Sequence, residues 1–271
     1  MVSIKIDDVL FAHAKYSTDF QESKYIIWDR NFILGNEKIA IYTDNSLTRV
    51  NKRVKTKVAW LLESPVVSSY WHNWIVSNFH LFDIIFTNNV DLLGINERFK
   101  FLPTAGCWIK PEDQKMWDKN KLVSIIASNK NFTNGHKLRN EIVDHYKSGG
   151  LDIYGRGFNE IPYKLNGLKD YRFSIVVENT KKDFYFTEKL IDCFATGTVP
   201  IYWGCPSIGN FFDIDGVISF NTLEDLKKII NSLSIDLYNS KIESIKNNLH
   251  KSKEYLMAED YMWEKYLKEC F

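Results

Sequence analysis

Short apolar runs alternate with amphipathic segments along the chain, and this alternation is typical of strands and helices in an α/β protein. In the first hundred residues the apolar runs are rich in β-branched and aromatic residues, which favours strands. A helix is predicted over 70–79, because its large apolar residues recur at helical spacing. The strands predicted in this half cover residues 2–6, 25–28, 38–42, 57–62, 82–86 and 98–102.

The second half contains two strand–helix–strand units, each with a polar loop after its first strand. Glycines end both helices, Gly149 in the first unit and Gly197 in the second. Asn221 or Thr222 is the expected cap of a later helix. The predicted strands are 122–127, 151–154, 173–177, 199–202 and 216–220. The predicted helices cover 138–146 and 190–195, a further helix starts at 222, and one or two amphipathic helices cover the remaining residues to 271.

The helix near residue 188 begins with an unusual charge. In strand–helix–strand units, ligands bind beyond the carboxyl ends of the strands, which places Glu178, Asn179 and the loop 180–187 at the binding crevice. Lys189 lies in the first helical turn, where the positive end of the helix dipole disfavours a cation. A diphosphate bound there would satisfy the lysine and the free backbone N–H groups. Alternatively, Lys189 is solvated, or paired with Glu188 or Asp192.

A second cation has a similar position in the preceding unit. The loop Ser128-Asn129-Lys130 follows a strand, and Arg139 lies one turn into the next helix. Its planar guanidinium group suits phosphate oxygens, although it could equally pair with Glu141 or Asp144.

In the first half, an acidic residue follows a predicted strand directly. The strand 57–62 ends in Glu63-Ser64-Pro65, and the proline delays the start of the next helix. The active site of an α/β protein usually lies at the carboxyl ends of its strands, and this carboxylate has such a position. Alternatively, Glu63 caps the next helix or lies in solvent.

Three motifs together resemble one family. They are Phe173-Ser-Ile-Val-Val-Glu178-Asn179, Tyr185-Phe-Thr187-Glu188-Lys189 and Gly197-Thr-Val-Pro200-Ile-Tyr-Trp-Gly204. Their residues and spacing are similar to the donor-binding signature of the α-1,3/4-fucosyltransferases, glycosyltransferase family 10. The resemblance implies a GT-B fold of two Rossmann-like domains facing across a cleft. It also implies GDP-fucose as donor, a glycan acceptor and inversion at the transferred sugar.

The resemblance also implies roles for single residues. Glu63 would be the catalytic base, and Arg139 and Lys189 would bind the diphosphate. Glu188 would hold the ribose hydroxyls, whereas Glu178 would contact the sugar or orient the loop. The donor site implied by the resemblance comprises Ser128, Arg139, Tyr154, Gly155, Glu178, Asn179, Tyr185, Thr187, Glu188 and Lys189.

We expect two domains, an acceptor-binding domain over 1–110 and a nucleotide-sugar-binding domain over 111–271, with a terminal helix able to pack back on the first. Apart from Glu-Ser-Pro, the first domain resembles the family weakly, and this is the domain expected to choose the acceptor. The 271 residues suffice for two modest cores.

The composition is that of a soluble globular protein, with 45% apolar and 25% charged residues. The aromatic content of 15% mildly favours a carbohydrate ligand, and the net charge of +1 gives no reason to expect nucleic acid. The four cysteines form no C-x-x-C pair, so neither a zinc site nor a disulfide framework is expected. The absence of a signal peptide or membrane span predicts a cytoplasmic location, unlike the anchored animal members, with peripheral membrane association still compatible.

Asp213-Ile-Asp215 has the form of a metal-binding D-x-D motif, but it precedes a predicted strand and reads as a turn. We therefore expect no metal site, no tightly bound cofactor and no essential divalent metal. Two other functions stay open: transfer of another sugar or to a non-lactosamine acceptor, and an inactive nucleotide- or glycan-binding protein. A metabolite-binding Rossmann protein would require a glycine fingerprint that the sequence lacks.

Overall fold

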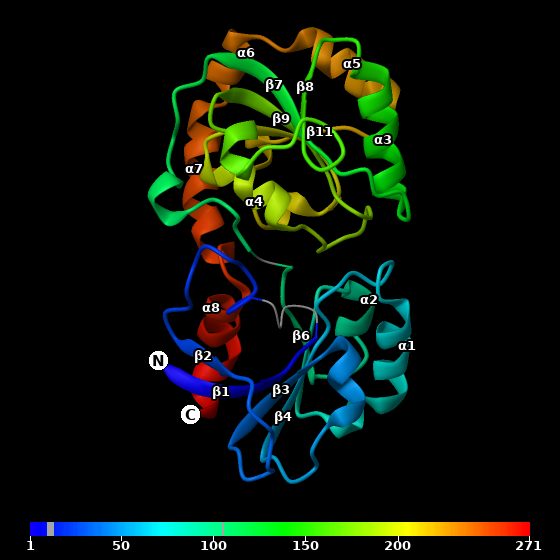
Figure 1. Ribbon diagram of the computed structural model, residues 1–271, viewed down its shortest axis with the longest axis vertical. Helices are drawn as coiled ribbons and strands as arrows, with labels where there is room; N and C mark the ends of the chain where they lie inside the picture. The colour runs from blue at the N-terminus through cyan, green and yellow to red at the C-terminus, as the bar shows by residue number, and fades with distance from the viewer. Residues whose placement is uncertain (10–13, 105) are drawn as a thin grey trace. The chain divides into compact units, whose positions relative to one another are not determined.

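The computed structural model describes residues 1–9, 14–104 and 106–271, which form two compact units. The N-terminal unit comprises Met1–Gly106 together with Met257–Phe271, and the C-terminal unit comprises Cys107–Leu256. The chain therefore returns to the first unit for its last fifteen residues (Figure 1).

The N-terminal unit is built on a six-stranded sheet in which all neighbouring strands are parallel. Its strand order is β2-β1-β3-β4-β5-β6, so the direction of winding reverses between β1 and β3. Ligands of such sheets bind at the carboxyl ends of the strands next to this reversal. The strands are β1 (Val2–Asp7), β2 (Ile26–Asp29), β3 (Ile39–Thr43), β4 (Thr56–Trp60), β5 (Ile84–Thr87) and β6 (Phe99–Phe101).

Buried apolar residues of this sheet make the core of the N-terminal unit. Every residue of β3 is buried, as expected for a strand covered on both faces. Helix α1 (Ser69–Asn78) contributes Ile75 to the core, and the short helix α2 (Val90–Leu93) contributes Leu92. The predicted helix over 70–79 is thus confirmed.

The C-terminal segment is anchored in the N-terminal unit by a buried carboxylate. Glu259 of α8 (Ala258–Met262) accepts hydrogen bonds from the Ser17 N–H at 2.8 Å and the Trp28 Nε1–H at 2.9 Å. Figure 1 shows α8 beside β1 and β2. Since a buried charge requires such partners, these contacts fix the segment on the sheet.

The C-terminal unit contains a five-stranded parallel sheet with the order β11-β10-β9-β7-β8. Here the winding reverses between β7 and β9, the strands that precede the Ser128 loop and the Glu178 loop. The strands are β7 (Lys121–Ile126), β8 (Asp152–Tyr154), β9 (Tyr171–Val177), β10 (Val199–Trp203) and β11 (Ile218–Ser219).

Helices α3 and α5 pack together beside this sheet (Figure 1), and α4 and α7 also pack together. The bounds are α3 (Asn134–Tyr146), α4 (Glu188–Ala195), α5 (Leu223–Ser232), α6 (Ile235–Ser240) and α7 (Ile242–Ser252). Thr222 caps α5 in a reciprocal arrangement with Asp225, as one of the two predicted caps.

The predicted strands are all present, but several are shorter than predicted, β4, β5, β6, β8 and above all β11. The segment after α5 was predicted as one or two helices and instead contains α6, α7, α8 and several short helical turns. The strand expected over 216–220 covers only Ile218–Ser219, because Gly216 belongs to a 3-10 turn that Asp213 caps through the Asp215 N–H. Asp213 also accepts a hydrogen bond from Asn247. The D-x-D residues therefore shape a turn, as predicted.

Across the described parts of the chain, the helices are all too short or too polar to cross a membrane.

Candidate active site

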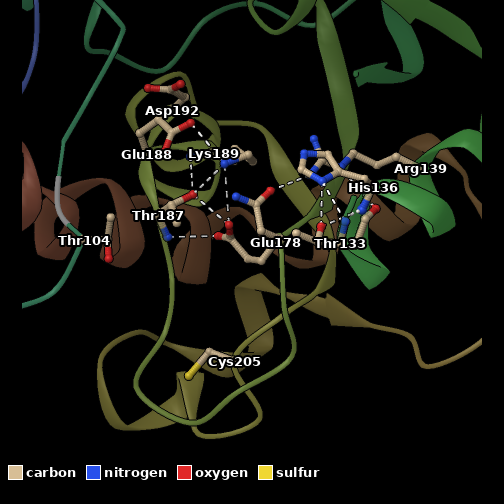
Figure 2. Close-up of polar contacts among 12 residues, drawn as sticks. Thr104, Thr133, His136, Arg139, Glu178, Thr187, Glu188, Lys189, Asp192 and Cys205 are labelled. Atoms are coloured by element: carbon tan, nitrogen blue, oxygen red, sulfur yellow. Dashed lines mark hydrogen bonds and ion pairs between the residues drawn. The ribbon is translucent and has the colours of Figure 1, made fainter. Parts of the chain in front are cut away.

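A buried glutamate organises the start of α4. Glu178 follows β9 and is fully buried. Its carboxylate accepts hydrogen bonds from the Thr187 N–H at 2.9 Å and the Thr187 hydroxyl at 2.7 Å. Thr187 in turn caps α4 by accepting from the Lys189 N–H. Figure 2 shows these contacts, through which Glu178 orients the loop that precedes the helix.

Lys189 lies in the first turn of α4, surrounded by acceptors. Its Nζ is 3.0 Å from the Thr187 hydroxyl, 3.1 Å from Glu188 Oε1 and 3.7 Å from Glu178 Oε2. The alternative pairing with Glu188 is therefore present. Burial alone would raise the pKa of Glu188, but the charges of Lys189 and Lys164 outweigh it and hold this pKa well below its usual range. Glu188 is thus an anion across the physiological pH range.

Lys164 is a site residue that the sequence analysis missed. Its Nζ lies 3.3 Å from Glu188 Oε1 and 3.0 Å from Asp192 Oδ2, so Asp192 pairs with Lys164. No motif surrounds Lys164, and its partners follow 24 and 28 residues later in the chain. Only the folding of the chain brings these charges together.

Arg139 is held at the start of α3 by the loop after β9. Its guanidinium group donates to Asn179 Oδ1 at 2.7 Å and to the Gly135 carbonyl at 3.3 Å. Asp144, an alternative partner, pairs with Lys147. The Asn179 carbonyl accepts from the Gly135 N–H at 3.1 Å, so the two polar loops of the sheet are joined directly.

His136 is a second residue that the sequence analysis missed. Thr133 and His136 cap each other at the start of α3: the His136 N–H donates to the Thr133 hydroxyl, and the Thr133 N–H donates to His136 Nδ1. Burial lowers the pKa of His136 to about 4, and the charge of Arg139 acts in the same direction. The imidazole is therefore neutral at pH 7. A capping box usually carries Glu or Gln at this position, so the pattern gave no signal.

A cavity of about 280 Å³ opens at the carboxyl ends of β7, β8 and β9. It brings together five of the predicted donor-site residues, with both cations among them. The predicted residues that line it are Ser128, Arg139, Gly155, Glu188 and Lys189. Three other predicted residues support this lining, Glu178 and Thr187 through Lys189, and Asn179 through Arg139. With Arg156 and Lys164, the lining thus contains four cationic side chains, of which Arg139 and Lys189 lie near the amino ends of α3 and α4.

Two predicted residues have other surroundings. The Tyr154 hydroxyl lies 2.6 Å from the Tyr171 hydroxyl, which donates to Asp152. Tyr185 is 2% exposed, and its N–H donates to the Lys182 carbonyl. Neither residue lines the cavity. The Tyr154 side chain is therefore directed toward Tyr171, and of the pair Tyr154-Gly155 only Gly155 lines the cavity.

Replacing Gly135 by Ala should destabilise the protein by about 3 kcal/mol or more, near the upper end of overpacking costs. The added Cβ would lie 1.7 Å from the Glu178 carbonyl oxygen and 2.8 Å from its carbon, and this backbone cannot move without displacing the Asn179 contact. Urea unfolding measures the loss. In the matched control, Gly209→Ala, the nearest atom is 3.8 Å away. Equal stability of the two variants would contradict this close approach.

Glu63 of the N-terminal unit follows β4, and its backbone is held from two sides. On one side, the Leu62 N–H donates to Asp44 Oδ1 at 3.2 Å. On the other, His72 Nε2–H donates to the Glu63 carbonyl at 3.0 Å, and Asn89 Nδ2–H donates to His72 Nδ1 at 3.4 Å. Helix α1 has Ser68 as its N-cap, so Glu63 is not the cap.

Asp44 should make the stability of the protein fall as the pH rises from about 4 to about 7. Burial, with the nearby charge of Glu63, raises the pKa of Asp44 to about 7, although the N–H groups of Leu62 and Glu63 oppose the shift. The folded state therefore keeps a proton that the unfolded state releases above about pH 4. Its contribution is fully present below that pH and is lost as the pH passes through the folded pKa.

Urea unfolding at pH 5 and pH 8 tests this dependence. The Asp44→Asn variant should lose less stability between the two pH values than the wild type, by up to about 3 kcal/mol, because about two pKa units of the shift lie between pH 5 and the folded pKa, at 1.4 kcal/mol per unit. The same loss in both proteins would show that Asp44 titrates normally.

Among residues 1–9, 14–104 and 106–271, no three or more His, Cys, Asp or Glu side chains are grouped so as to hold a metal ion.

Comparison with known proteins relates the C-terminal unit to one family. Residues 116–241 match the family model described as glycosyltransferase family 10 (fucosyltransferase), C-terminal part. The alpha-(1,3)-fucosyltransferase FucT of Helicobacter pylori is 31% identical over 118 residues, which are 41% of this chain and 24% of that protein. The chain therefore spans about a quarter of the length of this relative.

Solved structures extend the likeness to both units. The crystal structure of an alpha1,3-fucosyltransferase has a TM-score of 0.57 and 20% identity, covering 94% of this chain and 89% of that one. A structure of alpha1,3-fucosyltransferase with GDP-fucose has a TM-score of 0.54 and 18% identity, covering 94% and 90%. The likeness confirms the predicted fold, two parallel-sheet α/β units of the GT-B class.

Proposed function

Because residues 116–241 belong to glycosyltransferase family 10, we propose that the protein transfers L-fucose from GDP-fucose to a hydroxyl of a glycan acceptor, with inversion, as an α-1,3-fucosyltransferase does. The donor is supported by the family description and by the related structure that contains GDP-fucose.

The observation that carries the proposal is the pairing of Arg139 and Lys189 around one cavity. Each cation lies in the first turns of a helix, where a negatively charged ligand would also interact with the positive end of the helix dipole. Lys189 is already paired with Glu188, whereas the hydrogen-bond partners of Arg139 are the neutral Asn179 amide and Gly135 carbonyl. A diphosphate would accept hydrogen bonds from Arg139 and from the other cations of the lining, Arg156, Lys164 and Lys189.

In the proposed reaction, Glu63 takes the proton of the acceptor hydroxyl as its oxygen attacks the anomeric carbon of the donor sugar. The bond between that carbon and the diphosphate oxygen breaks at the same time, and GDP leaves with the bonding electrons. Attack opposite the leaving group converts the β-linked donor into an α-fucoside.

The negative charge that develops on the diphosphate is stabilised by Arg139, Lys189 and the amino ends of α3 and α4. With these groups in place, no divalent metal is essential in the proposed step. Glu188, an anion beside Lys189, would accept hydrogen bonds from the ribose hydroxyls. Ser128, Gly155 and Asn179 would shape the nucleotide pocket, with Tyr154 and Tyr185 supporting the turns behind it.

Product analysis tests the proposal. Incubation with GDP-fucose and N-acetyllactosamine should yield a trisaccharide heavier by one deoxyhexose, and the proton NMR coupling of its new anomeric signal should be that of an α-fucoside. A β-fucoside would contradict the single displacement, and an unchanged disaccharide would contradict the acceptor class.

A further inference from the structure

Lys164 joins two acidic side chains of α4 in the wall of the cavity. Its Nζ donates to Glu188 Oε1 at 3.3 Å and to Asp192 Oδ2 at 3.0 Å. The two acids are one helical turn apart, so they lie on the same side of α4 (Figure 2). All three residues line the cavity. The lysine therefore bridges consecutive turns of the helix that begins at the proposed diphosphate site.

Asp192 is the buried end of this bridge. Its side chain is 2% exposed, and its other oxygen, Oδ1, accepts from the Trp108 N–H at 2.7 Å. The Lys164 ammonium group also lies 5.5 Å from the centre of the Trp108 ring. Because a buried carboxylate is stable only with such partners, Asp192 holds Lys164 Nζ in place and has no oxygen left for a ligand.

The backbone that carries Lys164 is also fixed. Lys164 begins the 3-10 helix η4 (Lys164–Gly167), and the Gly167 carbonyl accepts from the Ser124 hydroxyl at 2.6 Å. The carbonyl of the next residue, Leu168, accepts from the Thr198 hydroxyl at 3.0 Å. Ser124 belongs to β7, and Thr198 directly precedes β10. The lysine therefore reaches α4 from a segment that the sheet holds in place.

Glu188 is the accessible end of the bridge. Its side chain is 23% exposed, and Lys164 and Lys189 both donate to the same oxygen, Oε1. Neither lysine donates a hydrogen bond to Oε2. A carboxylate with one oxygen held by two cations keeps a defined orientation, and its second oxygen can accept from a ligand. The neighbouring hydroxyls of a ribose are suitable donors.

We propose that Lys164 is a positioning residue for donor recognition, which holds Glu188 so that its carboxylate accepts hydrogen bonds from the ribose hydroxyls. The inference rests on the proposed function in identifying the ligand as a guanine nucleotide. A lysine has three N–H donors, of which two go to Glu188 and Asp192, so the third remains for the diphosphate. Through Glu188, Lys164 makes the site selective for a ribonucleotide.

Titration calorimetry with GDP and with 2′,3′-dideoxy-GDP, which lacks both ribose hydroxyls, tests this role. The wild type should bind GDP roughly 10- to 100-fold more tightly, the usual effect of hydrogen bonds to a charged group. In Lys164→Met this ratio should fall to roughly threefold or less, because Glu188 loses a cation that orients it. Loss of the diphosphate contact weakens both nucleotides alike and cancels in the ratio.

A double variant separates positioning from a structural role. Lys164→Met leaves the Asp192 carboxylate buried without its cation, so its Tm should fall. Lys164→Met combined with Asp192→Asn removes this unpaired charge, and the asparagine oxygen can still accept from the Trp108 N–H. The Tm of the double variant should therefore recover toward that of the wild type, whereas the preference for GDP should stay lost.

Two further variants serve as controls. Lys164→Arg keeps a cation between the two acids and should keep most of the preference for GDP. Lys147→Met breaks the exposed pair of Lys147 with Asp144 in the same unit, and it should change neither the Tm nor the ratio of affinities.

Three results would overturn the proposal: a wild-type ratio in Lys164→Met, recovery of both Tm and ratio in the double variant, or equal affinity of the wild type for the two nucleotides. The proposed reaction fails in a different way. If Lys164→Met loses the preference that the wild type shows, but no GDP is released from GDP-fucose, the positioning role stands and the reaction does not. If transfer occurs and Lys164→Met keeps the preference, the reaction stands and the positioning role does not.

Discussion

Glu63→Gln is expected to lower kcat for fucosyl transfer by roughly 10²- to 10⁴-fold, the usual contribution of a general base. Glutamine keeps the shape of the side chain but cannot take the proton of the acceptor hydroxyl. The backbone contacts from Asp44 and His72 do not involve the Glu63 carboxylate, so the local fold should persist. Initial rates at saturating GDP-fucose and acceptor give kcat, and calorimetry gives the affinity for GDP.

The affinity for GDP should be unchanged in Glu63→Gln, because the nucleotide is proposed to bind the C-terminal unit. Glu97→Gln is the matched control: Glu97 is exposed and precedes β6, at the opposite edge of the same sheet, so its kcat should equal that of the wild type. A parallel loss of kcat and GDP affinity in Glu63→Gln would mean that Glu63 has a structural role.

Arg139→Ala is expected to weaken GDP binding by roughly 10- to 100-fold, as expected for the loss of hydrogen bonds between charged groups. The substitution removes a buried cation from the cavity and leaves Asn179 Oδ1 without its 2.7 Å donor. Titration calorimetry with GDP measures the effect, which should exceed the effect on free guanosine because guanosine lacks the diphosphate.

The exposed Lys137 provides the control on the same helix. Lys137→Ala removes one positive charge from α3 on its solvent side and should leave the affinity for GDP within twofold of the wild type. If Arg139→Ala bound GDP as tightly as Lys137→Ala, the cavity would not be the diphosphate site.

Local patterns were sufficient to predict most of the fold. Strands such as β3 and β9 are continuous apolar runs, and glycines such as Gly197, with a φ of 69°, mark helix ends directly. The strand predicted over 216–220 was too long, because the turn that Asp213 caps includes Gly216. In that case a local side-chain contact determined the boundary, and the apolar pattern did not show it.

The cavity was predictable where its residues follow a strand or begin a helix. Ser128, Gly155, Glu188 and Lys189 all have such positions, so the topology of the sheet was enough to gather them. Glu178 has the predicted position but is fully buried, since it accepts hydrogen bonds from Thr187 at the start of α4.

Residues whose partners are distant in the sequence could not be predicted. Lys164 meets Asp192 across 28 residues, and Asp44 meets the Leu62 N–H across 18. Neither contact leaves a periodic or motif signal. His72 lies in the first turn of α1, nine residues after Glu63, and donates a hydrogen bond to the Glu63 carbonyl. These contacts determine how the charged groups are oriented, and they follow from the tertiary fold alone.

Nucleotide release from three donors tests the central claim most directly. The purified protein is incubated with GDP-fucose, GDP-mannose or UDP-galactose, each with and without N-acetyllactosamine. The proposed function predicts acceptor-dependent release of GDP from GDP-fucose alone. Release from another donor but not from GDP-fucose, or no release from any of the three, would contradict it.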